Sequence, residues 1–116
     1  FSTIVVSFGD KPMIHVIATI GIAPGRRAEF LQEFHRLVPL VRAETGCIEY
    51  GPTIDVETGI EGLPAARDNV VTVVEQWETV ASLRAHLAAP HMAKYREAVK
   101  DMLTGVDIRV TEPVSG

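Results

Sequence analysis

A β-branched run that passes almost directly into a helix start is the feature that most constrains the fold. Residues 70–74 read Val-Val-Thr-Val-Val, which is typical of a strand. Continued alternation puts Glu75 and Trp77 on one face of that strand. Thr79 then suits the N-cap of a helix, on which His86 lies at the edge of the apolar stripe. The stretch therefore predicts a helix packed on a sheet, with an acid, the only tryptophan and a histidine directed toward the layer between them.

Apolar spacing elsewhere predicts the remaining helices and strands. Alternating or helical periodicity indicates a buried strand over residues 13–22, an amphipathic helix around residues 30–41, a strand over residues 47–54, a helical region over residues 79–103 with a break at Pro90, and a last strand over residues 106–111. Gly46 suits the C-cap of the first helix. In the strand over residues 47–54, Ile48, Tyr50 and Pro52 are expected to share a face, and Pro52 favours an edge position or a strand end. Residues 55–69 form a long loop, and this length favours a mobile segment or a contact with another subunit.

The order of these elements predicts an α+β fold. A β-α-β-β-α-β order is the ferredoxin-like arrangement, in which two helices cover one face of an antiparallel sheet. The uncovered face contains apolar residues, so we expect a homodimer that packs sheet on sheet. At 116 residues the chain has room for one domain, which we place at residues 13–112. Residues 1–12 are expected to form an N-terminal arm or an extra strand, and residues 113–116 a tail.

Composition excludes several classes of function. The net charge of −4 and the lack of a basic patch argue against a nucleic-acid binder. The single cysteine, Cys47, excludes an internal disulfide and makes a cysteine-based metal site implausible, which suits a cytoplasmic protein. No apolar run reaches the roughly 18 residues that a membrane span needs. The sequence also has no glycine-rich phosphate loop, so no dinucleotide-binding motif is visible.

Each candidate site residue also has an ordinary structural explanation. Trp77 alone is most often core filler, and Glu75 on a strand is most often solvated or paired with a base. His86 at an apolar edge is usually a core or interface histidine with a satisfied ring. His91, beside a proline, is usually a helix-start residue. The cluster, rather than any single member, favours a small-molecule pocket between sheet and helices.

Four sequence blocks occur in order along the chain: Met13-Ile14-His15-Val16-Ile17-Ala18, Glu44-x-Gly46-Cys47-x-x-Tyr50, Glu75-Gln76-Trp77-Glu78 and Ala85-His86-Leu87-x-x-Pro90-His91-Met92-x-x-Tyr95. Together they resemble the antibiotic biosynthesis monooxygenase family, and are most similar to its quinol monooxygenase branch. The resemblance covers about residues 13–112. It implies a dimeric α+β barrel with one pocket per subunit. It also implies oxygenation of a quinol or phenolic substrate by dioxygen without flavin, haem, metal or any other cofactor.

Chemistry of this kind requires a base, because a phenol becomes a good electron donor to dioxygen only as its phenolate. Histidine has the appropriate pKa, and His86 is the first choice, with His91 or His15 as substitutes. Glu75 is expected to orient a histidine or the substrate hydroxyl.

The aromatic residues of the same blocks are expected to bind the substrate. Trp77 and Tyr50 would wall an apolar pocket that holds the aromatic ring and dioxygen away from water. Tyr95 would donate a hydrogen bond to a carbonyl or peroxide oxygen. His15, on the first strand, is also placed among the substrate-binding residues.

Two other classes of function stay open at this point. The His-x-x-x-Pro-His pattern also resembles family relatives that isomerise small phosphorylated metabolites. Such an isomerase would use the same histidines as proton shuttles and Arg84 or Arg109 to hold an anion. The chain could also be a non-enzymatic dimeric binding or stress-response module, in which the same residues are core. Oxygen consumption with a quinol separates the first class from the other two.

Overall fold

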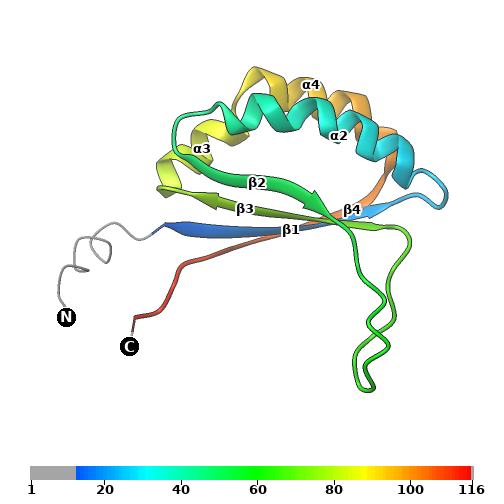
Figure 1. The fold of residues 1–116 in the computed structure, drawn as a ribbon. Coiled ribbons are helices and arrows are strands. Elements are labelled where there is room, and N and C mark those ends of the chain that lie inside the picture. The colour runs from blue at the N-terminus through cyan, green and yellow to red at the C-terminus, as the bar shows by residue number, and fades with distance from the viewer. Residues whose placement is uncertain (1–12, 116) are drawn as a thin grey trace.

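The β-branched run forms the third strand of a four-stranded antiparallel sheet. The structure, a computed structural model, describes residues 13–115 (Figure 1). The expected arm at residues 1–12 therefore lies outside the described residues. Sheet order is β2-β3-β1-β4. The elements are β1 (Ile14–Ile22), α2 (Arg27–Arg42), β2 (Cys47–Thr53), β3 (Val70–Trp77), α3 (Val80–Leu87), α4 (Pro90–Val99), the 3-10 turn η1 (Lys100–Met102) and β4 (Leu103–Thr111).

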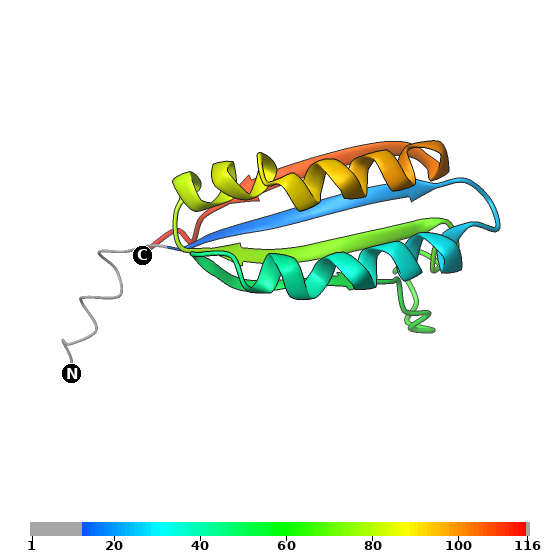
Figure 2. The same ribbon diagram turned by 90° about the horizontal axis from the view of Figure 1, so that it is seen from above.

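The fold confirms the ferredoxin-like arrangement predicted from the element order. The helices lie on one face of the sheet, with α2 on the β2 side and the α3–α4 pair on the β4 side (Figure 2). Phe30 and Phe34 of α2 are fully buried against the sheet, as their helical spacing predicts. Side chains alternate along β3, with those at Val71, Val73 and later odd positions buried under the helices.

The second helical region is divided where the proline predicts a break. Thr79 caps α3 by accepting a hydrogen bond from the backbone N–H of Ser82, whose side chain in turn accepts from the backbone N–H of Thr79. Pro90 occupies the first turn of α4, where its missing N–H costs nothing. The region therefore forms two separate helices, with Ala88 and Ala89 between them.

Two local predictions are wrong, for identifiable reasons. The first helix ends at Arg42 with Ala43 as its C-cap, so Gly46 is not the cap. Gly46 has a φ of 87° in the turn that leads into β2, and a Cβ there would lie 2.5 Å from the Cβ of Ser82. Ile48 does not share the buried face with Tyr50, because an irregularity in the β2–β3 register separates them and leaves Ile48 46% exposed.

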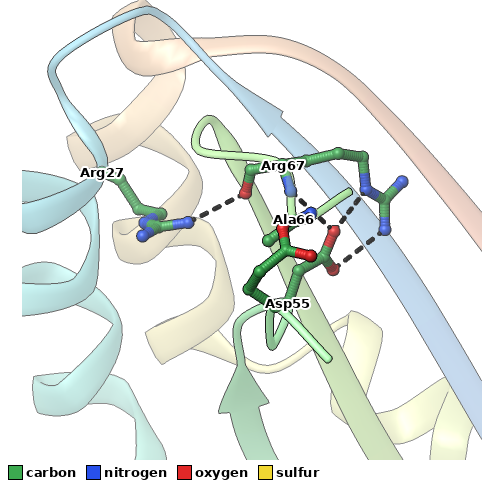
Figure 3. A network of polar contacts seen from close by, with 5 residues as sticks. Arg27, Asp55, Ala66 and Arg67 are labelled. Atoms are coloured by element: carbon green, nitrogen blue, oxygen red, sulfur yellow. Dashed lines mark hydrogen bonds and ion pairs between the residues drawn. The ribbon is translucent and has the colours of Figure 1, made fainter. Parts of the chain in front are cut away.

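The long loop between β2 and β3 projects away from the helices on the far side of the sheet (Figure 1). It contains no regular helix. Its base is closed by Asp55, which accepts hydrogen bonds from the backbone and the side chain of Arg67, while Arg27 of α2 donates to the Arg67 carbonyl (Figure 3). The loop therefore forms a braced projection rather than an open coil.

Within residues 13–115, no helix has the length and apolar character that crossing a membrane requires.

Candidate active site

A cavity of about 380 Å³ lies between the helix-facing side of the sheet and the helices. This volume falls within the usual range for small-molecule sites. Side chains from all four strands and from α2, α3 and α4 line it, and most of them are apolar or aromatic. The lining includes a buried carboxyl group, that of Glu75, and a buried imidazole, that of His86. The cavity thus combines an apolar wall with a small number of groups that can move protons.

Glu75 lies on β3, in register with Val16 of β1 and Tyr50 of β2. Strand alternation brings Trp77 to the same side, so that its indole Nε1 donates a hydrogen bond to Glu75 Oε1 at 2.8 Å. Burial raises the pKa of Glu75 to about 7, opposed by the Trp77 hydrogen bond and reinforced by the negative charge of Glu44. Near neutral pH this carboxyl group can therefore either donate or accept a proton.

His86 lies at the end of α3 and is 1% exposed. Its ring packs on the indole of Trp77, with centroids 4.7 Å apart, and meets the edge of Tyr50 at 5.4 Å. Burial lowers the pKa of His86, while the hydrogen bond and the charge of Glu44 raise it.

The two ring nitrogens of His86 differ in their contacts. Nδ1 lies 3.0 Å from Glu44 Oε2, and Nε2 has no hydrogen-bond partner among the described residues. Because His86 lines the cavity and Glu44 contacts Nδ1, Nε2 is the ring nitrogen that remains for a contact with a ligand.

Glu44 is the functional candidate to which sequence reasoning gave no role. It lies in the turn between α2 and β2, and its Oε2 contacts both His86 Nδ1 at 3.0 Å and His91 Nε2 at 2.6 Å. The close approach of Gly46 to Ser82 brings this turn against the start of α3. The presence of Glu44 in a family block was the available signal, but its partners lie 42 and 47 positions away in the chain.

Tyr50 and Tyr95, which are expected from the sequence to bind substrate, both line the cavity. Phe34 stacks on Tyr50 with centroids 5.6 Å apart and meets Tyr95 edge-on at the same distance. Burial raises the pKa of both tyrosines well above its usual range, so each remains a neutral hydroxyl that can donate a hydrogen bond.

Three of the residues predicted for the site take different positions. Trp77 is fully buried behind the cavity wall, where it holds Glu75 and His86 rather than facing a ligand. His91 lies at a neighbouring surface hollow between α2 and α4, and reaches the site only through Glu44. His15 does not line the cavity, because alternation in β1 buries Ile14 and directs His15 to the other face of the sheet.

The basic residues near the cavity also differ from those expected to hold an anion. Arg109 is paired with Asp107 and lies opposite Ile17 on the uncovered side of β1 and β4. Arg84 is exposed and does not line the cavity. Arg96 and Lys100, at the C-terminal end of the α4 region, do line it.

Across residues 13–115, no group of three or more His, Cys, Asp or Glu side chains is placed to hold a metal ion. Glu44, His86 and His91 instead form a hydrogen-bonded cluster with one shared oxygen. The chain thus forms a ferredoxin-like α+β domain with a cavity of small-molecule size, lined by groups that can donate or accept protons.

Comparison with known proteins agrees with this description. Residues 13–98 match the family model described as antibiotic biosynthesis monooxygenase. The Escherichia coli K12 protein named probable quinol monooxygenase YgiN is 42% identical over 103 residues, which cover 87% of this chain and 98% of that protein. The chain therefore belongs to the antibiotic biosynthesis monooxygenase family.

Solved structures show the same fold. The crystal structure of PA3566 from Pseudomonas aeruginosa is 27% identical, with a TM-score of 0.75, over 90% of this chain and 96% of that one. A conserved protein from Methanosarcina mazei Go1 is 22% identical, with a TM-score of 0.78, over 93% of this chain and 99% of that one. At the latter identity the likeness concerns the fold alone.

Proposed function

We propose that this protein is a cofactor-independent monooxygenase that oxygenates a quinol or phenolic small molecule with dioxygen. The observation that carries the proposal is the cavity itself, in which Glu75 and His86 are buried among apolar and aromatic side chains. Family membership and the similarity to a protein named probable quinol monooxygenase support the same reaction class. An apolar cavity suits both an aromatic ring and dioxygen.

The reaction balances without an external reductant. One oxygen atom of dioxygen replaces a ring hydrogen as a hydroxyl group, the other leaves as water, and the quinol becomes a hydroxyquinone. The substrate supplies all the electrons that dioxygen accepts, because both its hydroxyl groups and one C–H bond are oxidised.

His86 begins this sequence by taking the proton of a substrate hydroxyl at Nε2. The resulting phenolate transfers an electron to dioxygen more readily than the neutral phenol. Glu75 exchanges a second proton with the substrate oxygen, since its pKa of about 7 leaves both of its forms populated near neutrality. General acid–base help of this kind contributes roughly 10²–10⁴-fold in rate.

The remaining cavity residues orient the ligand. The neutral hydroxyls of Tyr50 and Tyr95 donate hydrogen bonds to a carbonyl or peroxide oxygen. Trp77 supports the site from behind, because its N–H fixes one oxygen of Glu75 and its ring holds the plane of His86.

Oxygen uptake with a naphthoquinol tests the reaction, with autoxidation of the quinol subtracted. We expect enzyme-dependent uptake and incorporation of one atom of isotopically labelled dioxygen into the product. His86→Ala should lower turnover about tenfold or more, while the control His35→Ala, an exposed position on α2, leaves it unchanged. Uptake no faster than autoxidation, or equal turnover in both variants, would contradict the proposal.

The active form is proposed to be a homodimer that pairs through its sheet. Apolar side chains remain uncovered on the sheet: Ile17 on the far face is 37% exposed, and Val106, Ile108 and Val110 of β4 are about half exposed. Burial of such surface drives association. Sedimentation analysis at micromolar concentration should give a dimer, and a monomeric species would contradict this part of the proposal.

A second candidate function is the isomerisation of a small anionic metabolite. It is favoured by Arg96 and Lys100, which bring two positive charges to the cavity lining. The histidines would then shuttle protons with no consumption of dioxygen. Turnover of a phosphorylated metabolite without oxygen uptake would select this reaction over monooxygenation.

A further inference from the structure

We propose that Glu44 and His91 are positioning residues that set the tautomer of His86 and limit its basicity. The inference rests on the proposed function in one respect only, namely that His86 is the base. It concerns residues that make no contact with the substrate cavity themselves, since neither Glu44 nor His91 lines it. Their effect on the reaction passes entirely through the imidazole of His86.

The tautomer follows from the chemistry of the carboxylate. An ionised carboxylate can only accept hydrogen bonds, so the His86 Nδ1 that lies 3.0 Å from Glu44 Oε2 carries the hydrogen. In a neutral imidazole the other nitrogen, Nε2, then has the free lone pair. His86 lines the cavity, and Nε2 is the ring nitrogen that Glu44 does not contact. Glu44 therefore presents His86 to a ligand in the form that accepts a proton.

The restraint on basicity follows from the sharing of one oxygen. Glu44 Oε2 accepts from both imidazoles, and its contact with His91 Nε2 is the shorter, at 2.6 Å against 3.0 Å. A carboxylate beside an imidazole stabilises the protonated ring. Two imidazoles at one oxygen compete for that stabilisation, and a positive charge on one ring disfavours a positive charge on the other.

Burial opposes protonation of His86. Its side chain is only 2% exposed, whereas that of His91 is 24% exposed and that of Glu44 is 15% exposed. Because charging a buried group is costly, burial lowers the pKa of His86. His86 therefore favours the neutral form, which a base must have before it reacts.

Other charged and titratable groups near His86 are the same whether Glu44 or His91 is substituted. Arg96 of α4 lowers the pKa of His86 by its positive charge, while Glu75 of β3 and Tyr50 of β2 share the cavity. None of these is altered by a substitution at Glu44 or His91, so a comparison of variants isolates the shared contact.

Titration of the imidazoles by NMR, in the full chain labelled with ¹⁵N at histidine, tests the inference without any substrate. Glu44→Gln should lower the pKa of His86, because it removes the negative charge that stabilises the imidazolium. His91→Asn should raise the pKa of His86, because it removes the competing ring. The nitrogen shifts of the unaltered protein should show hydrogen on Nδ1 of His86. His35→Asn, on the exposed side of α2, is the matched control and should change neither.

If Glu44 and His91 only supported the fold, the two substitutions would not be expected to move the pKa of His86 in opposite directions. Equal or absent shifts of the His86 pKa, or hydrogen on Nε2 in the unaltered protein, would overturn the inference. Should Glu44→Gln fail to fold, Glu44→Asp shortens the side chain and should shift the His86 pKa in the same, downward direction.

Activity then separates this inference from the proposed reaction. If a naphthoquinol is turned over, the acidic limb of the kcat/KM profile should move to lower pH in Glu44→Gln and to higher pH in His91→Asn. Opposite changes of the His86 pKa without quinol turnover would support the role of Glu44 and His91 and contradict the proposed reaction. Quinol turnover without these pKa changes would support the reaction and contradict that role.

Discussion

The buried carboxyl group of Glu75 should make the protein less stable as the pH rises. Its side chain is 6% exposed, and burial raises its pKa from an ordinary 4.5 to about 7. The folded state therefore holds a proton between these values that the unfolded state has lost. Because the folded state binds more protons there, the free energy of unfolding falls as pH rises from 4.5 through 7. The difference in pKa corresponds to about 3 kcal/mol at alkaline pH.

Glu75→Gln should abolish this loss. The glutamine keeps an oxygen that can accept from Trp77 Nε1, fills nearly the same volume and cannot ionise. Below pH 4.5 the variant and the unaltered protein should have the same free energy of unfolding. Above pH 7 that of the variant should be larger by up to about 3 kcal/mol. His86, whose pKa is lowered by burial, gives the opposite trend, but it is present in both proteins and cancels in the comparison.

Urea unfolding at a series of pH values from about 5 to about 8.5 measures the difference, with the denaturant slope checked for constancy. Glu49→Gln on β2 is the matched control, because Glu49 is an exposed carboxylate on the neighbouring strand, and it should show no difference that depends on pH. A stability difference between Glu75→Gln and the unaltered protein that stays flat across this range would refute the reasoning. So would a variant that loses stability relative to the unaltered protein as pH rises.

Three further substitutions test the elements that hold the site. Trp77→Ala should cost about 3–5 kcal/mol in urea unfolding, since the ring is fully buried, and should also release the fixed oxygen of Glu75; a cost below 1 kcal/mol would contradict the packing. Thr79→Ala removes one half of the capping box with Ser82 and should cost about 0.5–2 kcal/mol, measured in the same way, whereas an unchanged midpoint would argue against the cap. Gly46→Ala should destabilise the protein by more than about 1 kcal/mol, because a side chain at positive φ is strained and its Cβ meets Ser82; a thermal midpoint equal to that of the unaltered protein would show that the turn can relax.

Local sequence determined the elements and the directions of side chains within them. β-branched residues and alternation specify β3 and place Glu75 and Trp77 on one face, because the period of a strand is fixed by its own backbone. Thr79 and Pro90 likewise set the start of α3 and the break before α4, since capping and a missing N–H act within a few residues. The family blocks then extended these local rules to the order of the whole fold.

Only the tertiary structure decided which side chains meet. Glu44 reaches His86 and His91 across more than 40 positions of chain, and this contact depends on how the turn before β2 seats against α3. Trp77 lies behind the cavity rather than in its wall, because His86 packs over its ring. Periodicity gives the direction of a side chain relative to its own element, whereas the distance between two elements is set by packing that involves the entire core. For that reason the histidine was visible in the sequence, and the carboxylate that orients it was not.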